Sequence, residues 1–341
     1  PAGVLLTAPL GLISYDQAAL IWFVFELCLL LAAASFVRRR FSLLSPGCCG
    51  LMLFTIFLAG AMPVSRSYIS GQFSIAILFL SCLLYRSWLA GDSRGIGIWT
   101  GLALALKMFG WPIVFFLLIR RNWRALSTVF IVLVCSHILS WLLIGKDGLK
   151  SYYGEAVPAV IQSYRADGAN LSLFGFGQRF FGGLRPPVRV DIAVPPLIDL
   201  PEAAPYAGAG IAAIVLFWVM LTCLKANRPE TGPALLIALS AVFSPVVWLH
   251  GLSVMLIPLS VAFMFLQGLS FPSRHTAACA VLVFLFYCGD LFSKLLPGDG
   301  EPVSFALSLI TLLPTVLVLV LMKYLAQLDA ACGRKAASVQ G

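Results

Sequence analysis

Charged side chains are scarce in this chain. Asp, Glu, Lys and Arg together make up 11% of its 341 residues, whereas apolar residues make up 60%. A soluble domain carries about a quarter of its residues as charged side chains. The polar surface is too small to cover a water-soluble globule, which excludes a soluble enzyme or binding module. Because backbone groups in hydrocarbon must be hydrogen-bonded within their own segment, we predict an all-α integral membrane protein with a single domain over residues 1–341.

Metal-binding patterns are also missing. The nine cysteines show no paired metal spacing and lie mostly inside apolar segments, where Cys acts as a small apolar side chain. The chain contains no DxD, no HxxxH and no cluster of carboxylates, so we expect no metal and no other cofactor. An N-terminal Met is missing as well, and we expect a first span and an external loop to precede Pro1.

The net charge of +9 comes from short basic runs beside apolar segments. Such runs fix the orientation of membrane proteins, so the charge does not indicate nucleic-acid binding. The run Arg38-Arg39-Arg40 is expected in the cytoplasm, with residues 1–16 outside at the membrane surface. About nine spans are predicted on this basis, at residues 17–37, 50–62, 73–88, 125–144, 208–224, 233–243, 252–266, 277–292 and 303–321.

Residues 96–119 are expected to form a short helical hairpin rather than a crossing. The segment is interrupted by LKMFGWP and is flanked by Arg94 and Arg120. A straight crossing of about 20 residues would place one of these basic ends outside. The hairpin leaves Lys107 at its apex, and a Lys inside the membrane is functional by default. The structural alternative is a Lys that extends to a nearby interface.

The long polar interval at residues 146–206 is predicted to be an external loop. It is rich in Gly, Pro, Tyr and charge, and it shows no spanning pattern. Loops of that length inside a compact protein are usually functional or disordered. The centre, SYRADGANLSLFGFGQRFFGG, has the composition of a sugar-binding or lipid-binding wall, whereas residues 184–205 are expected to be a tether. All unusual polar segments are expected on the same outer face.

Several polar residues on that face are candidates for substrate binding. Arg66 and Gln72 lie in a polar turn beside a helix N-terminus, which suits an anion, and Arg66 and Lys107 could hold a lipid phosphate from two sides. Asn170 and Ser172 match the N-x-[ST] glycosylation pattern, although we favour a place in the substrate wall. Ser244, Trp248 and His250 form the last group; His can act as acid or base, and the alternative is an aromatic anchor at the membrane interface.

Four motifs occur in an order that resembles a known family. They are GQFS (71–74), ALKMF (105–109), NLSLFG (170–175) and SPVVWLH (244–250). Over roughly residues 1–265 the chain resembles the polyprenyl-phosphate-dependent glycosyltransferases of family 87, a GT-C-type group that includes bacterial mannosyltransferases. The resemblance places Gln72, Lys107, Asn170, Ser172, Ser244, Trp248 and His250 on motif positions. The chain departs from the family pattern at Ser74, Met108 and Gly251.

The resemblance implies a GT-C-like multi-helix bundle in a bacterial inner membrane, with its active site facing outside. Such an enzyme moves a hexose, here expected to be mannose, from a polyprenyl-phosphate sugar to a lipid-linked or envelope glycan acceptor. It also implies an acidic catalytic base in the first external loop, upstream of Pro1. Among the external carboxylates, Asp16, Glu155 and Asp167 are stand-ins, and none of them lies in a recognisable motif.

Two other functions fit the composition. A secondary transporter or flippase of lipid-linked intermediates is the main alternative, although such proteins are built from internal repeats and none is evident in this sequence. A catalytically inactive scaffold is the third possibility, and the chain's start at Pro1 keeps it open.

Overall fold

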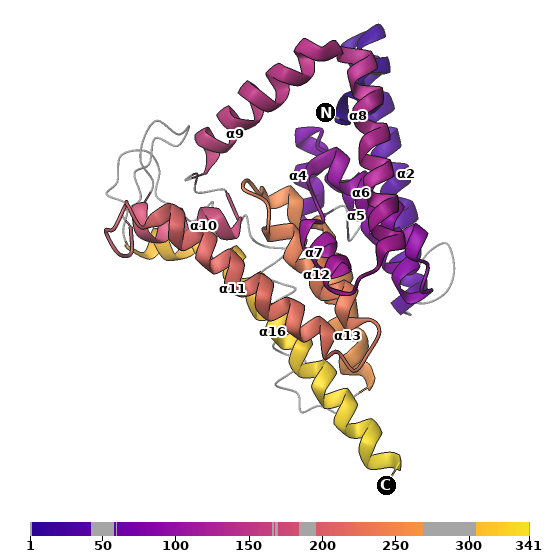
Figure 1. Ribbon diagram of the computed structural model, residues 1–341, viewed down its shortest axis with the longest axis vertical. Helices are drawn as coiled ribbons and strands as arrows, with labels where there is room; N and C mark the ends of the chain where they lie inside the picture. Colours follow the sequence, from indigo (N-terminus) through magenta and orange to yellow (C-terminus); the bar gives the residue numbers. More distant parts are fainter. Residues whose placement is uncertain are drawn as a thin grey trace. The chain divides into compact units, whose positions relative to one another are not determined.

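The computed structural model describes residues 2–41, 58, 60–165, 167, 170–183, 196–268 and 305–340. Every element in these ranges is helical (Figure 1). Five of the helices are long and apolar enough to cross a membrane, namely Tyr15–Phe41, Trp123–Tyr164, Ala204–Leu224, Leu249–Leu266 and Leu312–Gly333. The chain is therefore an all-α protein with several candidate membrane spans, as its composition predicts.

The expected count of nine spans is not confirmed. The five long helices overlap five of the predicted spans. Two further predicted spans coincide with shorter apolar helices, Ser74–Leu89 and Thr231–Val242. The remaining two, at residues 50–62 and 277–292, lie almost entirely outside the described residues.

The chain divides into two compact units, Pro1–Pro158 and Ala159–Gly341. Each unit is described separately below, and the expectation of a single domain stays a prediction. The first unit contains α1 (Gly3–Thr7), η1 (Ala8–Leu12), α2 (Tyr15–Phe41), α4 (Met62–Ser70), α5 (Ser74–Leu89), α6 (Ser93–Lys107), α7 (Trp111–Ile119), α8 (Trp123–Ser151) and η2 (Tyr152–Ala156).

Helices α5, α6 and α8 lie side by side in the first unit, and α2 packs on α5 (Figure 1). The close approach of α6 and α8 depends on two small residues four apart. A Cβ added at Gly97 would lie 2.5 Å from the Ala125 carbonyl oxygen, and one at Gly101 would lie 2.8 Å from the Val132 Cβ. Small residues at this spacing allow helices in membranes to approach closely.

Helices α6 and α7 form the predicted hairpin. The break lies at Met108 and Gly110, which have φ values of 53° and 107° in the left-handed region. This conformation ends α6 immediately after Lys107, and Pro112 then occupies the first turn of α7. The sequence LKMFGWP therefore predicts the hairpin and its apex correctly.

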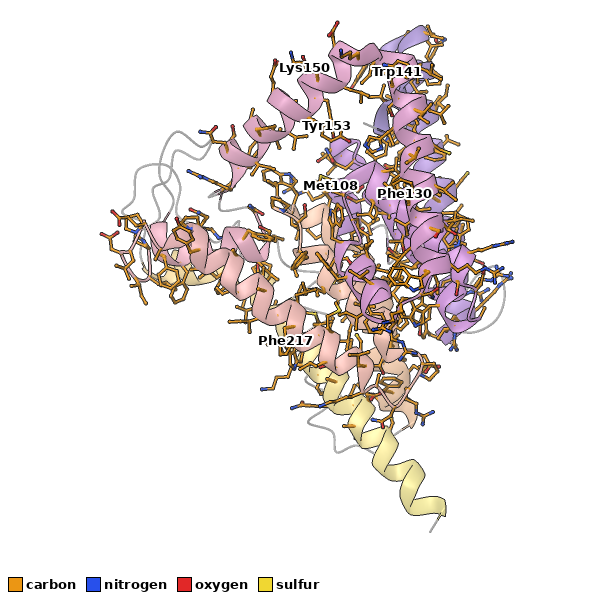
Figure 2. All side chains as sticks on the ribbon, in the orientation of Figure 1. Met108, Phe130, Trp141, Lys150, Tyr153 and Phe217 are labelled. Carbon is orange, nitrogen blue, oxygen red and sulfur yellow. The ribbon has the colours of Figure 1, made fainter. Side chains whose placement is uncertain are left out.

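The exposed side chains of α8 are largely apolar. Phe130 is 68% exposed, and it projects from this helix together with Trp141 (Figure 2). Ile131, Leu139 and Leu142 are exposed on the same helix. A helix that presents large apolar side chains along its exposed surface is suited to contact with lipid. The apolar part ends at Gly145, where φ is 72° and the helix is kinked.

The second unit contains α10 (Leu173–Gly182), α11 (Ala204–Leu224), α12 (Thr231–Val242), η3 (Leu249–Met255), α13 (Leu256–Gly268) and α16 (Phe305–Gln340), while α9 (Val157–Tyr164) crosses the boundary between the units. Helix α12 is buried along its whole length. It packs against α11, α13 and α16, and therefore forms the centre of this unit.

The segment expected to be an external loop, 146–206, is largely helical where it is described, and its external position stays a prediction. Helix α8 continues to Ser151, and η2, α9 and α10 follow. The Gly-rich composition conceals α10, which begins where the Ser172 hydroxyl accepts a hydrogen bond from the Gly175 amide at 2.8 Å. The tether expected at residues 184–205 lies largely outside the described part of the chain.

Candidate active site

In the first unit, Lys107 is bonded to Ser74 of the GQFS motif. Its ammonium group donates a hydrogen bond to the Ser74 hydroxyl at 2.9 Å. Ser74 is buried at the start of α5, and Lys107 is the last residue of α6. The contact joins GQFS to ALKMF, and it is made by one of the residues at which the chain departs from the family pattern.

Gln72 and Arg66 lie close by in the sequence, around the end of α4. The Ser67 hydroxyl donates to the Gln72 carbonyl at 3.0 Å, and Gly71 adopts the left-handed conformation that ends the helix. These bonds fix the backbone just before Ser74. Arg66 is exposed on α4. The predicted phosphate clamp made by Arg66 and Lys107 stays a prediction.

The residues around Lys107 include an acidic group that the sequence reasoning missed. Glu26 is the only acidic residue in the apolar run 17–37, and it is buried on α2. It interacts electrostatically with Lys107. An acidic residue inside an apolar span is functional by default, so the signal was present in the sequence.

Two further polar groups belong to the same region. Burial, followed by the charge of Glu26, raises the pKa of the Tyr68 hydroxyl to about 12, so this phenol stays protonated near neutral pH. Trp22 lies one turn before Glu26 and packs edge-on against Phe73, with ring centroids 5.1 Å apart. Helices α2, α4, α5 and α6 therefore all contribute to this group of side chains.

In the second unit, the motifs NLSLFG and SPVVWLH are bound directly to each other. The Asn170 amide nitrogen donates to the carbonyl oxygens of Tyr164, Arg165 and Pro245, at 3.1, 3.3 and 3.1 Å. Its oxygen accepts from the amides of Ser172 and Val247, at 3.1 and 2.9 Å. These hydrogen bonds join two of the four motifs that the resemblance singles out.

Ser172 continues this connection. Its hydroxyl donates to the Pro245 carbonyl at 3.1 Å while it caps α10. Asn170 and Ser172 are completely buried and their polar atoms are used within the protein. Their described role is structural, and direct contact of either residue with a substrate stays a prediction.

Trp248 and His250 follow in the same segment. The Trp248 ring lies edge-on to Tyr164, with centroids 5.0 Å apart. His250 is buried in η3, and Ser244 is partly buried. Ser244, Trp248 and His250 belong to the second unit, as Asn170 does, whereas Lys107 belongs to the first.

A buried charged pair supports this second group. Arg179 on α10 donates to the Asp167 carbonyl oxygen at 3.2 Å. Burial lowers the pKa of Arg179 to about 10, and the nearby Asp167 carboxylate opposes this shift. Arg179 is therefore still cationic at neutral pH. Asp167, one of the stand-ins for the catalytic base, is buried beside this cation.

The chain is thus a multi-helix membrane protein with buried polar groups, and its family follows from comparison with known proteins. The model of glycosyltransferase family 87 matches residues 1–247. The chain belongs to this family.

The chain is also similar, at low sequence identity, to a characterised protein. The chain is similar to an alpha-(1->3)-arabinofuranosyltransferase of Mycobacterium tuberculosis, found in two strains of that organism, and is 26% identical to it over 185 residues. The match covers 53% of this chain and 41% of the relative, so the chain corresponds to less than half the length of that protein. No solved structure matches the chain.

Proposed function

We propose that this protein is a membrane glycosyltransferase that takes a sugar from a polyprenyl-phosphate donor and transfers it to a glycan or glycolipid acceptor on the extracytoplasmic face. The family supports the reaction class. The single observation that carries the donor class is Lys107, a cation at the end of α6 in an apolar hairpin, fixed by the buried Ser74 hydroxyl. A cation in such surroundings is suited to bind a phosphate group of a lipid.

The proposed role of Lys107 follows from the charge that develops during transfer. When the acceptor hydroxyl displaces the lipid phosphate from the sugar C1, the phosphate leaves with additional negative charge. An ammonium group already in position stabilises that charge without reorganisation. Arg66 and His250 are proposed to assist at the phosphate, and Gln72 and Trp248 are proposed to contact the substrate.

The identity of the sugar has two candidates. Hexose transfer, with mannose as the sugar, follows from the resemblance to family members. The relative's name instead favours an arabinofuranosyl group. Both sugars can be carried on the same polyprenyl phosphate, so the proposed role of Lys107 is the same for each.

The proposal is tested in membranes that contain the protein in its native length. Radiolabelled polyprenyl-phosphate mannose and polyprenyl-phosphate arabinofuranose are supplied separately, and label in lipid and glycan fractions is measured. We expect transfer from one of the two donors and a loss of roughly a hundredfold to a thousandfold in Lys107→Ala. His250→Ala is assayed in parallel, and its loss of transfer would link the second unit to the same reaction.

Lys225→Ala is the matched control, because Lys225 is exposed at the end of α11. This variant should transfer sugar at the parental rate. Unchanged transfer in Lys107→Ala would contradict the assigned phosphate site. Movement of an intact lipid-linked sugar across vesicles, without transfer from either donor, would instead identify a flippase.

A further inference from the structure

Glu26 is a buried carboxylate that nothing in the described structure satisfies. Its side chain is 1% exposed, and neither carboxylate oxygen has a hydrogen-bond partner among the described residues. A buried polar group without a hydrogen bond costs about 1–3 kcal/mol, and most buried polar groups in proteins are hydrogen-bonded. In the ionised form, which the nearby Lys107 favours, the two oxygens are acceptors only, and a ligand that satisfies them donates hydrogen bonds.

The groups around Glu26 come from two other helices and from α2 itself. Lys107 of α6 and Tyr68 of α4 both interact with its charge, and Trp22 lies on the same face of α2, one turn away. The Tyr68 hydroxyl and the Trp22 indole nitrogen are also buried without hydrogen-bond partners in the described part of the chain. Two unsatisfied polar groups therefore accompany Glu26.

These groups differ in the ligand chemistry that they accept. Lys107 attracts a phosphate, whereas the Glu26 carboxylate repels one and needs hydroxyl donors. An indole N–H and a phenol provide further hydrogen bonds, and their rings provide apolar faces. A sugar phosphate has both parts in one molecule, an anionic phosphate and a ring with several hydroxyl groups.

We propose that Glu26, together with Trp22 and Tyr68, binds the hydroxyl groups of the donor sugar whose phosphate is held by Lys107. The assignment rests on the proposed function and identifies the protein's sugar-binding residues. Glu26 acts in binding the sugar, and it accepts hydrogen bonds from two ring hydroxyls. The orientation of the sugar is then fixed relative to the phosphate that leaves.

Comparing the binding of two lipids distinguishes a sugar-binding role of Glu26 from the role of a counter-charge for Lys107. Polyprenyl phosphate without a sugar can contact Lys107 but offers no sugar hydroxyls, whereas the sugar-bearing donor identified by the transfer assay offers both parts. Binding of each lipid to the purified native-length protein is measured in detergent. We expect Glu26→Gln to bind the sugar-bearing lipid roughly tenfold to a hundredfold more weakly, the effect of losing charged hydrogen bonds. Binding of the lipid without sugar should weaken less than threefold.

Trp22→Phe provides a second, milder variant that keeps the aromatic ring and removes only the indole N–H. This variant should weaken the binding of the sugar-bearing lipid only, by roughly threefold to tenfold. Glu202→Gln is the control, because Glu202 is exposed, and both lipids should bind to it as they bind to the parent. Lys107→Ala should weaken the binding of both lipids.

The outcomes distinguish this inference from the proposed function. If Glu26→Gln weakened the binding of both lipids equally, Glu26 would be a counter-charge for Lys107, and the sugar-binding role would be overturned. Unchanged binding of both lipids by Glu26→Gln and Trp22→Phe would place the sugar elsewhere. If the parent protein binds neither lipid, the polyprenyl-phosphate donor itself is wrong, and the sugar-binding role fails with it.

Discussion

Asn170 connects two distant motifs through a single side chain. Its two amide N–H groups donate to three backbone carbonyl oxygens, so that one N–H is shared, and its oxygen accepts from two backbone amides. A carboxylate would keep the acceptor positions but would direct negative oxygens at three carbonyl oxygens. The identity of this residue is therefore set by the need for both donors and acceptors.

Asn170→Asp should destabilise the second unit by about 3 kcal/mol or more, because buried carbonyl groups lose their donors and face a charge. The measurement is thermal unfolding of the purified protein in detergent. Asn122→Asp is the matched control: its side-chain oxygen caps α8 by accepting from the Ala125 amide at 3.2 Å, and Asp caps a helix as well as Asn. The Asn122 nitrogen donates to the Ser93 hydroxyl, which can donate to an Asp carboxylate instead. A similar loss of stability in both variants would show that the arrangement around Asn170 is not responsible.

The residues of the candidate site are predictable from the sequence to different degrees. Lys107 stands out because a cation in an apolar hairpin has few structural explanations. Glu26 carries the same signal, an ionisable side chain inside an apolar span, but it lies outside the four family motifs and was not predicted. Asn170 and Ser172 both donate to the Pro245 carbonyl, more than 70 residues away, and no local pattern in the sequence contains that information.

At the level of whole elements, α10 and α11 pack unusually closely. A Cβ added at Gly208 would lie 2.6 Å from the Phe174 carbonyl oxygen, and one at Gly177 would meet the Gly208 backbone. Backbone atoms cannot move aside as a flexible side chain can, so both glycines are required at the point where the helices meet.

Gly208→Ala should therefore lower the free energy of unfolding by about 1–3 kcal/mol, the usual cost of overpacking. Gly210→Ala lies on the same helix and meets no atom within 4 Å. That variant should be neutral or more stable by up to about 1 kcal/mol, because Ala favours the helix over Gly. Thermal unfolding of both proteins in one detergent gives the comparison, and two shifts of the same sign would contradict it.

Helix boundaries were predictable where hydrophobicity alone sets them. The predicted spans at 17–37 and 208–224 correspond to α2 and α11 within a few residues at each end, since hydrocarbon requires long apolar helices. The hairpin break was predictable from its Gly and Pro residues. Helix α10 was not, because its Gly-rich segment begins at the Ser172 cap, and Ser172 is bonded to the distant Pro245 carbonyl, which the local composition does not reveal.

The arrangement of the whole molecule in the membrane stays a prediction, and it can be tested at two exposed positions. Tyr206 is 79% exposed near the start of α11, and Arg39 is exposed near the end of α2. The basic run around Arg39 is expected in the cytoplasm, whereas the segment before α11 is expected outside. Phe217 is 65% exposed further along α11 (Figure 2), as expected of a lipid-facing residue.

Cysteine labelling gives the measurement. A membrane-impermeant maleimide should react with Tyr206→Cys in intact cells and with Arg39→Cys only after the cells are made permeable. The parent protein is the control for its own cysteines, and those within apolar spans should react little because hydrocarbon disfavours the thiolate. The reverse pattern would place the candidate active site on the cytoplasmic side.

Helix α16 lies beyond the residues that the family model matches, yet it is bonded to segments inside them. The Thr315 hydroxyl donates to the Leu171 carbonyl at 2.9 Å. The Asp329 carboxylate accepts from the backbone amides of Asn227 and Arg228 and from the Thr231 hydroxyl, at 2.8, 2.9 and 2.7 Å. Residues 1–247, which the family model matches, are therefore not an independent module that could be exchanged between family members. A chimaera joined after residue 250 would keep all four motifs and lose the hydrogen bond that Thr315 donates to one of them, at Leu171.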